Sequence, residues 1–424
     1  MSLRDIGLRR RYRAEKRFRI YGVLAIGVSL AFLAMLMFSI VAKGYTAFAQ
    51  TAICLPIYFD KSIIDPQDKA KEDKTVLFLA DYPLLVRQAL ARELNIDLHD
   101  RKNLTDLKKF YSASSRKVLR NAVAENPAII GTTRKIEFLA SADIDSANKG
   151  QINLAVPESD RKVSDRQLAW LRQLKEKSVI YKIFNKNLFL GTASSRAENA
   201  GLATAFIGSL YLMLIVLVLA LPLGVGAAIY LAEYAPKNKF TDVLEININN
   251  LAAVPSIVFG LLGLSIFINF MGLPRSSSLV GGLVLCLTTL PTIIISTRSA
   301  LRSIPSSIRS AALALGASKT QMVFHHCLPL AMPGILTGAI IGIAQAMGQT
   351  APLLLIGMVA FVASYPVTPL DPATVLPVQI YIWSGEMQRA FVERTSAAIM
   401  LLLLFLILMN LIAVILRQKF EKKW

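Results

Sequence analysis

Two amides and a hydroxyl within an apolar stretch are the first side chains that could do chemistry. Gln345 and Gln349 are four residues apart, so a helix would place both on one face, with Thr350 beside them. Amides are costly in an apolar helix unless they meet a partner helix or a water-filled path. The sequence leaves two interpretations open, which are lining of a path for a polar solute and hydrogen bonding between packed helices.

Other patterns of reactive side chains are missing from the sequence. It contains no Walker A loop, no G-x-S-x-G or H-E-x-x-H motif, and no paired carboxylates within an apolar stretch. We therefore expect no catalytic residues, no cofactor and no enzymatic activity of the chain itself. The cysteines and histidines also lack the spacing of a metal site or a disulfide framework. They are Cys54, Cys286, Cys327, His99 and the adjacent pair His325 and His326.

The composition indicates that the elements positioning these amides lie in a membrane. The chain has 424 residues, of which 54% are hydrophobic and 18% charged, and its mean hydropathy is +0.50. A soluble domain of this size does not need so much apolar surface, and too little of the chain is polar for disorder. The net charge of +19 would suggest a nucleic-acid partner in a soluble protein. In a membrane protein it indicates basic flanks that set orientation, so we expect no nucleic-acid partner.

Six apolar runs predict six membrane-spanning helices. Residues 1–19 are rich in arginine, and the uncharged run 20–42, at roughly 34 Å as a helix, is long enough to cross a bilayer. A signal-like Ala-Phe-Ala sequence follows at 47–49, but the apolar run exceeds a signal core, so we expect an uncleaved anchor. Five further spans are expected at about 202–231, 246–270, 278–297, 333–359 and 396–416.

The segment between the first two spans has the composition of a water-soluble domain. Its short apolar stretches 75–80 and 151–156 predict strands. The periodic stretches 84–94, 104–124 and 164–177 predict amphipathic helices.

The expected fold class is therefore an all-α membrane protein with six transmembrane helices and an inserted α+β domain. The expected parts are a basic N-terminus with the first helix at 1–42, the inserted domain at 43–200 and a transmembrane domain at 201–424.

The distribution of basic residues predicts the orientation in the membrane. With a cytoplasmic N-terminus, six spans return the C-terminus to the cytoplasm, and most basic residues of the short loops fall on that side. The short outer loops then hold only Arg275, Arg389 and Arg394. The domain 43–200 would lie outside, because long domains cross largely regardless of charge.

The cytoplasmic segment 298–332 is long for a connector and has a helical pattern of its own. Ser306 or Ser307 could cap a helix over 308–315, and Gly316 would end it.

This segment resembles the EAA loop of ABC importer permeases, whose pattern is Glu-Ala-Ala, three residues, Gly, nine residues, Ile, one residue and Leu-Pro. The spacing fits throughout, although Ser310 replaces the glutamate and His326 the isoleucine. The resemblance implies a short helix that docks in a groove of an ATPase subunit and transmits its movement to the spans. The matching residues are Ser310, Ala311, Ala312, Gly316, Leu328 and Pro329.

Further stretches across 201–424 resemble phosphate-importer permeases of the PstA type. The resemblance implies a subunit of an ATP-driven phosphate importer that forms half of the translocation pathway in the bacterial inner membrane. Its implied partners are a second permease of the PstC type, an ATPase dimer of the PstB type and an outer phosphate-binding protein of the PstS type. The matching stretches are LAAVPSIVFG at 251–260, GQTAPLL at 348–354, PLGV at 222–225, YLAEYA at 230–235 and LPVQIY at 376–381.

The same resemblance makes Gln345, Gln349 and Thr350 candidates for the translocation path. Some relatives carry an arginine where Gln345 stands and a glutamate where Gln349 stands. Phosphate needs donors that replace its water, and the expected spans hold almost no cations. The cationic contact would then come from the partner permease.

The resemblance also implies where the partners would bind. The loop 310–329 would contact the ATPase, and the outer loops at about 271–277 and 360–395 would meet the binding protein. The domain 43–200 resembles an extra domain of some members, and its ligand cannot be read from its residues.

Three alternatives remain beside this interpretation. An ABC permease for another oxyanion or small solute would share all of these features. A membrane sensor would also have an anchor and an outer domain, but it would continue into a cytoplasmic signalling module. A secondary transporter would show paired inverted repeats, and the sequence shows no internal repeat.

Overall fold

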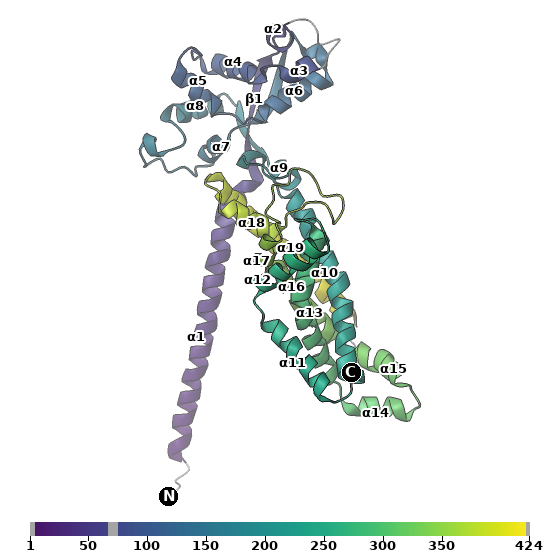
Figure 1. The fold of residues 1–424 in the computed structure, drawn as a ribbon. Helices are drawn as coiled ribbons and strands as arrows, with labels where there is room; N and C mark the ends of the chain where they lie inside the picture. The colour runs from purple at the N-terminus through teal and green to yellow at the C-terminus, as the bar shows by residue number, and fades with distance from the viewer. Residues whose placement is uncertain (1–4, 67–74, 421–424) are drawn as a thin grey trace.

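The structure is a computed structural model that describes residues 5–66 and 75–420. It has three parts, which are a long first helix, a head domain formed by residues 45–200 and a helical bundle formed by residues 201–420 (Figure 1). The expected fold class is confirmed, because the bundle is helical and a small separate sheet lies in the head domain.

Helix α1 (Asp5–Gly44) runs apart from the bundle for most of its length (Figure 1). Its apolar window is 0% buried within the chain, as expected of a surface that faces lipid. Near its C-terminal end it packs against α19 (Ala390–Phe420). A β-carbon on Gly44 would lie 2.8 Å from Met400 Sδ, so the missing side chain permits this close approach.

A three-stranded antiparallel sheet lies at the centre of the head domain. The central strand β1 (Ala49–Tyr58) pairs with β2 (Thr133–Leu139) on one side and with β3 (Ile180–Phe184) on the other. The register places Ala49 opposite Phe184. The sheet therefore joins the segment leaving α1 to the segment leading into the bundle.

The core of the head domain lies between this sheet and the surrounding helices. Ile53, Leu55 and Ile57 alternate along β1 and are fully buried, which is the period of a strand with one covered face. Helix α4 begins at a capping aspartate, Asp81, and ends at Asn95 in the left-handed conformation. The head-domain helices are α2 (Lys61–Ile64), α3 (Thr75–Leu79), α4 (Tyr82–Leu94), α5 (Arg101–Lys108), α6 (Ser115–Glu125), α7 (Ala142–Asn148), α8 (Asp165–Glu176) and α9 (Lys186–Leu190), with short 3₁₀ turns at η1 (Tyr45–Phe48), η2 (Pro127–Ile129), η3 (Glu158–Asp160) and η4 (Ala197–Asn199).

Both strands predicted for the head domain are wrong. The stretch 75–80 forms helix α3, because a short apolar run suits either element and here packs as a helix, with Leu77 carbonyl accepting from the Tyr82 hydroxyl at 2.7 Å. The stretch 151–156 is an irregular loop. Asn153 Oδ1 accepts from the Ala155 amide at 3.0 Å, a local bond that competes with strand pairing.

The predicted helices 84–94 and 164–177 correspond to α4 and α8, whereas 104–124 is wrong as a single helix. The chain leaves the helical path between α5 and α6, since Tyr111 forms a bridge with Ala140 at the end of β2. Tertiary pairing therefore overrides a continuous helical pattern at this point.

The bundle contains the remaining membrane helices. Counting α1, five helices of the described residues are long and apolar enough to cross a membrane, or six if the bent pair is counted as one span. Helices α10 and α13 pack closely, since a β-carbon on Gly224 would lie 2.6 Å from Ile293. The elements are α10 (Ala203–Ile229), η5 (Tyr230–Tyr234), α11 (Lys239–Ala253), α12 (Ser256–Gly263), η6 (Leu264–Phe270), α13 (Ser278–Arg302), α14 (Ser306–Ala314), α15 (Lys319–Gln321), η7 (Met322–Cys327), α16 (Leu328–Gly348), α17 (Ala351–Leu355), α18 (Leu376–Ser384) and α19.

The expected span 246–270 is broken. The chain bends by 99° between α11 and α12. Pro255 disfavours helical geometry at the preceding residue, and Val254 has an extended ψ of 130°. By contrast, α10 continues through Pro222.

The expected span 333–359 also differs in the structure. The helix runs continuously through Lys319–Gly348 and stops before Gln349, which is extended with ψ of 112°. The short helix α17 then starts after Thr350. This stop changes the placement of the two amides considered above.

Candidate functional site

The segment 298–332 lies at the end of the bundle remote from the head domain, where α14 and α15 project (Figure 1). Helix α13 extends through Arg302 into this segment. Pro305 occupies the N-cap position of α14, and no side chain caps the helix, so the predicted capping by Ser306 or Ser307 is wrong. The fixed φ of proline prepares this helix start in place of a hydroxyl cap.

Helix α14 buries one face and exposes the other. Ala312 is 5% exposed and packs in an apolar cluster with Val323 and Cys327. Ser310 and Ala311 are exposed. The apolar side chains of Leu313 and Leu315 are also exposed, at 48% and 89%. This projecting helix therefore presents apolar side chains at its free surface, as an interaction surface does.

Gly316 ends α14 as the spacing predicts. Its φ is +85°, a conformation that L side chains rarely adopt, while a β-carbon there would meet nothing within 4 Å. The Gly316 amide donates to Leu313 carbonyl at 3.0 Å, and the Ala317 amide donates to Ala312 carbonyl at 3.1 Å. Backbone conformation, and not lack of space, therefore requires glycine at this position.

Leu328 and Pro329 lie at the start of α16, where both are half-buried. Pro329 lies inside the continuous helix Lys319–Gly348, directly after the π-helical segment Met322–Cys327, where the regular backbone hydrogen-bond pattern is already interrupted. The preceding turn exposes His325 and His326. The predicted residues of the loop thus lie on one projecting unit, with its exposed groups on α14 and its buried groups against the bundle.

Arg309 and Glu233 form an ion pair that the sequence interpretation missed. Arg309 Nη2 donates to Glu233 Oε1 at 2.9 Å and to Leu301 carbonyl at 2.7 Å, and its Nη1 donates to Ile304 carbonyl at 2.7 Å. The Glu233 side chain is only 7% exposed. The signal in the sequence is that Glu233 is a single carboxylate at the end of a long apolar run.

A second contact joins the same two regions. The Lys319 ammonium lies 5.2 Å from the centre of the Tyr234 ring, a cation–π distance. The short π-helix η5 thus contacts α14 through Glu233 and α15 through the neighbouring Tyr234. The projecting loop is held to the end of α10 from two sides.

A further ion-pair group connects α11 with α13. Arg298 Nη2 donates to Glu245 Oε1, and Arg302 Nη2 lies 3.8 Å from the same oxygen. Helix α11 is the exposed arm before the 99° bend, so these pairs attach that arm to α13.

The structure does not place Gln345 and Gln349 on one helix face as the sequence predicts. Gln345 lies within α16 and is exposed, and its Oε1 accepts from the Thr292 hydroxyl of α13 at 3.4 Å. Gln349 follows the end of the helix, and its Oε1 is buried with no hydrogen-bond partner among the described residues. Thr350 is half-buried beside it. The helix stop at Gly348 separates the two amides.

The two loops at 271–277 and 360–395 are joined at the other end of the bundle. Ser277 forms an antiparallel bridge with Pro372, and the Ala373 amide donates to Ser276 carbonyl at 2.9 Å. Helix α18 lies within the second of these loops.

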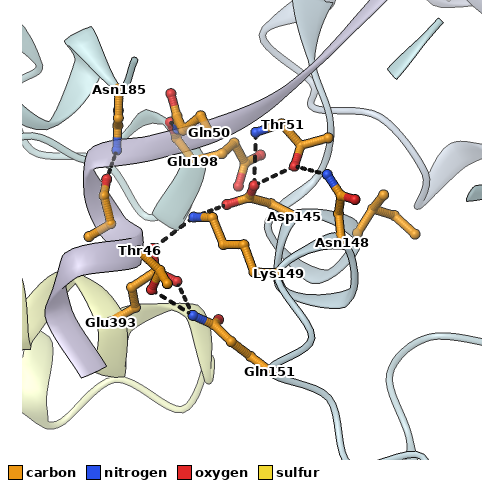
Figure 2. Close-up of polar contacts among 12 residues, drawn as sticks. Thr46, Gln50, Thr51, Asp145, Asn148, Lys149, Gln151, Asn185, Glu198 and Glu393 are labelled. Atoms are coloured by element: carbon orange, nitrogen blue, oxygen red, sulfur yellow. Dashed lines mark hydrogen bonds and ion pairs between the residues drawn. The ribbon is translucent and has the colours of Figure 1, made fainter. Parts of the chain in front are cut away.

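A buried charge network connects the head domain to α19, and the sequence interpretation did not predict it (Figure 2). Lys149 Nζ lies 2.7 Å from Asp145 Oδ2 and 2.7 Å from Glu393 Oε1, and its side chain is 2% exposed. Gln151 Nε2 donates to Glu393 Oε2 at 2.6 Å. Asp145 precedes Lys149 by four residues on the same helix, but Glu393 lies far along the chain, so no local pattern predicts the contact between the head domain and α19.

A metal centre would need several ligating side chains close together. Within residues 5–66 and 75–420, no group of three or more His, Cys, Asp or Glu side chains could hold a metal ion. Cys54, Cys286 and Cys327 are free.

Comparison with known proteins assigns the two halves of the chain separately. Residues 220–424 match the family described as the binding-protein-dependent transport system inner membrane component. Residues 5–158 match a domain of unknown function, DUF3333.

Several individual relatives are transport permeases. The phosphate transport system permease protein PstA of Yersinia pestis is 34% identical over 60% of this chain and 85% of its own length. PstA of Haemophilus influenzae is 30% identical over 53% of this chain and 78% of its own length. A probable ABC transporter permease protein of Bacillus subtilis, YqgI, is 39% identical over 39% of this chain, a match that spans 56% of that relative.

Solved structures of ABC transporters also resemble the bundle. An inward-facing methionine transporter, MetNI, matches with a TM-score of 0.41 and 18% identity over 52% of this chain and 94% of that chain. A bacterial importer of alginate matches with a TM-score of 0.39 and 16% identity, over 52% of this chain and 79% of that chain.

The identity to PstA permeases extends over most of their length, and the transport-family region 220–424 contains the projecting loop and the bent pair described above. Permeases of this family are multi-pass integral membrane subunits that work with an ATPase and a substrate-binding protein. The chain belongs to this family of ABC transport permeases, to its PstA-type members, and carries an additional head domain.

Proposed function

We propose that this chain is the permease subunit of an ATP-driven phosphate importer and forms half of its translocation pathway. The observation that carries the proposal is the 34% identity to a PstA permease across 85% of that protein. The subunit itself hydrolyses no ATP in this proposal, because an ATPase dimer of the PstB type supplies the energy.

The projecting loop 310–329 is the proposed contact with that ATPase. The exposed Leu313 and Leu315 support this role, since apolar side chains on a projecting helix suit a groove in a partner. Arg309 and Glu233 would pass the movement of α14 to the end of α10, because the carboxylate is buried and the guanidinium is bonded to several groups.

The proposed orientation places both termini in the cytoplasm. The excess of basic residues around the loop end of the bundle supports it. The parts 1–42, 43–200 and 201–424 are then an anchor, an extracytoplasmic domain and the permease domain. The joined loops 271–277 and 360–395 would face a phosphate-binding protein of the PstS type.

Gln345, Gln349 and Thr350 are the proposed polar groups of the path. The unpartnered Oε1 of Gln349 supports this, because a buried amide oxygen without a partner is costly unless a ligand or water uses it. Neutral amides do not neutralise a phosphate dianion, so a second permease of the PstC type would supply the cation.

The test is uptake of radiolabelled phosphate by phosphate-starved cells that lack this chain, with and without the gene restored. Restored uptake that requires an intact ATPase would support both the class and the substrate. Co-purification with an ATPase without phosphate uptake would keep the permease role and point to another oxyanion. If the restored chain neither supports uptake nor binds an ATPase, the proposal is wrong and a sensor becomes the better interpretation.

A further inference from the structure

A cavity of about 710 Å³ lies where the head domain meets the membrane helices. Its wall is formed by the end of α1 with η1, by α7 and the loop after it, by residues 160–162, and by the start of α19. This volume is in the range of small-molecule sites. The seam between two parts of the chain therefore contains space for a ligand.

Cations dominate the charged groups on the wall of this cavity. Lys43, Lys162 and Arg389 line it, and none of the three forms a salt bridge within the part of the chain that the structure describes. All three are exposed, so they are free to reach a ligand. Unpaired cations around a concave surface concentrate anions.

Arg161 is a fourth cationic residue of the wall, and one of its donors has no hydrogen-bond partner among the described residues. Its side chain is only 8% exposed, and its Nη2 contacts Asp165 Oδ1 at 2.6 Å. Its Nε is buried and has no hydrogen-bond partner among the described residues. Because this side chain also lines the cavity, its guanidinium adds positive charge to the wall beside Lys162.

The inner wall of the cavity holds charged groups that are already paired, since Lys149 and Glu393 line it and Asp145, which does not, also pairs with Lys149. Lys149, Asp145 and Glu393 satisfy one another (Figure 2). This network holds the two parts together and leaves the outer cations available. The anion-binding capacity thus belongs to Lys43, Lys162, Arg389 and the guanidinium of Arg161.

The position of the cavity sets the depth of a ligand in the membrane. Lys43 lies at the end of the apolar stretch of α1, and Arg389 directly precedes α19. Basic residues in such places lie at the level of lipid headgroups. Ala42 and Val392, which are exposed apolar neighbours, also line the cavity and give it an apolar side.

The acidic and hydroxyl groups of the cavity refine the ligand chemistry. Asp143 and Asp160 line it together with Thr46 and Ser146. Carboxylates beside the cations would repel a bare anion, but they accept hydrogen bonds from ligand hydroxyls. The combination suits a phosphate group that carries neighbouring hydroxyls.

We propose that this cavity binds a phosphate-bearing anion with attached hydroxyls, of the kind that an anionic phospholipid headgroup such as phosphoglycerol presents at the membrane surface. The phosphate would contact Arg161, Lys162 and Arg389, and the hydroxyls would contact the carboxylates. Free phosphate shares the phosphate group but not the attached hydroxyls, so from solution it could occupy the cationic part of the cavity alone. The site is separate from the translocation path, so the inference holds whichever solute the bundle transports.

The test uses the full-length chain purified in detergent. Phosphatidylglycerol, phosphatidylcholine with the same acyl chains, and sodium phosphate are titrated separately, and the bound species is counted by native mass spectrometry. The test variant is Lys162→Gln with Arg389→Gln. The matched control is Lys135→Gln with Lys182→Gln, which removes two exposed charges from β2 and β3 outside the cavity.

We expect phosphatidylglycerol to bind in preference to phosphatidylcholine, and the test variant to lose about tenfold or more in affinity while the control retains it. If sodium phosphate binds instead, and the test variant weakens that binding in the same way, the result would also support the site. The ligand would then be phosphate from solution and not a lipid headgroup. Equal binding of both lipids, unchanged binding in the test variant, or no binding of any probe would overturn the proposal. If the double variant does not fold, Lys43→Gln serves as the test variant under the same criteria.

Discussion

The guanidinium of Arg309 lies 2.9 Å from the carboxylate of Glu233 and connects the projecting helix α14 to the end of α10. The two residues are distant in sequence, and the carboxylate is almost fully enclosed. Two backbone carbonyls, of Leu301 and Ile304, occupy further donors of the same guanidinium. The orientation of α14 therefore depends on one side chain that is bonded in several directions.

Arg309→Gln should lower the free energy of unfolding by about 3 kcal/mol, because it leaves the buried carboxylate of Glu233 without a cation. Thermal unfolding of the purified chain measures this loss. Combining it with Glu233→Gln should recover most of the loss, since the uncompensated charge is gone.

Arg302→Gln is the matched control for this pair. Its side chain is 64% exposed and lies 3.8 Å from Glu245, so its removal should cost less than about 1 kcal/mol. Equal losses in Arg302→Gln and Arg309→Gln would contradict the role assigned to the buried pair.

Gly316→Asn and Gly316→Val should separate the effect of backbone conformation from that of size. Asparagine visits the left-handed region readily, whereas a β-branched residue is strained there by about 1–2 kcal/mol or more. A β-carbon at this position meets nothing within 4 Å, so crowding cannot explain a difference. We expect the asparagine variant to retain uptake and the valine variant to lose it at equal expression. Equal uptake by both variants would show that the sharp end of α14 is not required.

Leu315→Glu should abolish co-purification of the ATPase subunit and leave the thermal unfolding midpoint unchanged. The side chain is 89% exposed, so the chain does not need it for packing, while a charge there opposes burial against a partner. Leu79→Glu, at a head-domain site that is 79% exposed, is the control and should retain the ATPase. Retention of the ATPase by both variants would argue against α14 as the contact.

Two prolines show why the sequence predicts the number of apolar segments better than it predicts which segment bends. Both Pro222 and Pro255 lie in apolar runs, and α10 continues through the first while the chain bends by 99° at the second. The bent segment packs against α17, where a β-carbon on Gly260 would lie 2.7 Å from Pro352 Cα. The shape depends on that distant packing partner, which a local pattern does not contain.

Gln349→Leu should reduce uptake by about tenfold or more and leave stability equal or slightly higher. The Gln349 Oε1 is buried without a partner in the described chain, so removing it costs the fold no hydrogen bond there. Uptake and thermal unfolding are measured on the same variant. Normal uptake with a lowered unfolding midpoint would instead assign this amide to packing between helices.

Asp143→Asn tests the electrostatics of the cavity. Burial raises the pKa of Asp143 above 3.8, against the lowering effect of Lys162 and Lys109. A raised carboxyl pKa means that the stabilising contribution is complete below pH 3.8 and is lost as the pH rises through the folded-state value. Between about pH 4 and about pH 8, the thermal unfolding midpoint of the asparagine variant should therefore rise relative to that of the wild type as the pH increases. A difference that does not change with pH would rule out the carboxyl as its cause.

The sequence predicted the projecting loop well because its determinants are local. Gly316 ends a helix through its own φ, and the spacing from Ala312 to Pro329 is contained in one segment. The contacts of Arg309 with Glu233 and of Lys149 with Glu393 were missed, because these carboxylates come from other elements. The strands were missed for a related reason, since β1 acquires its pairing only from segments far along the chain.

The pairing of Ala49 with Phe184 also sets the order in which the sheet can form during synthesis. The ten-residue central strand β1 emerges from the ribosome well before β3, a delay on the order of ten seconds at ordinary rates of synthesis. During that time a largely apolar strand has an open edge that is prone to association with other chains. The second edge of β1 is therefore covered only late in synthesis, and it stays open for longer when translation is slower.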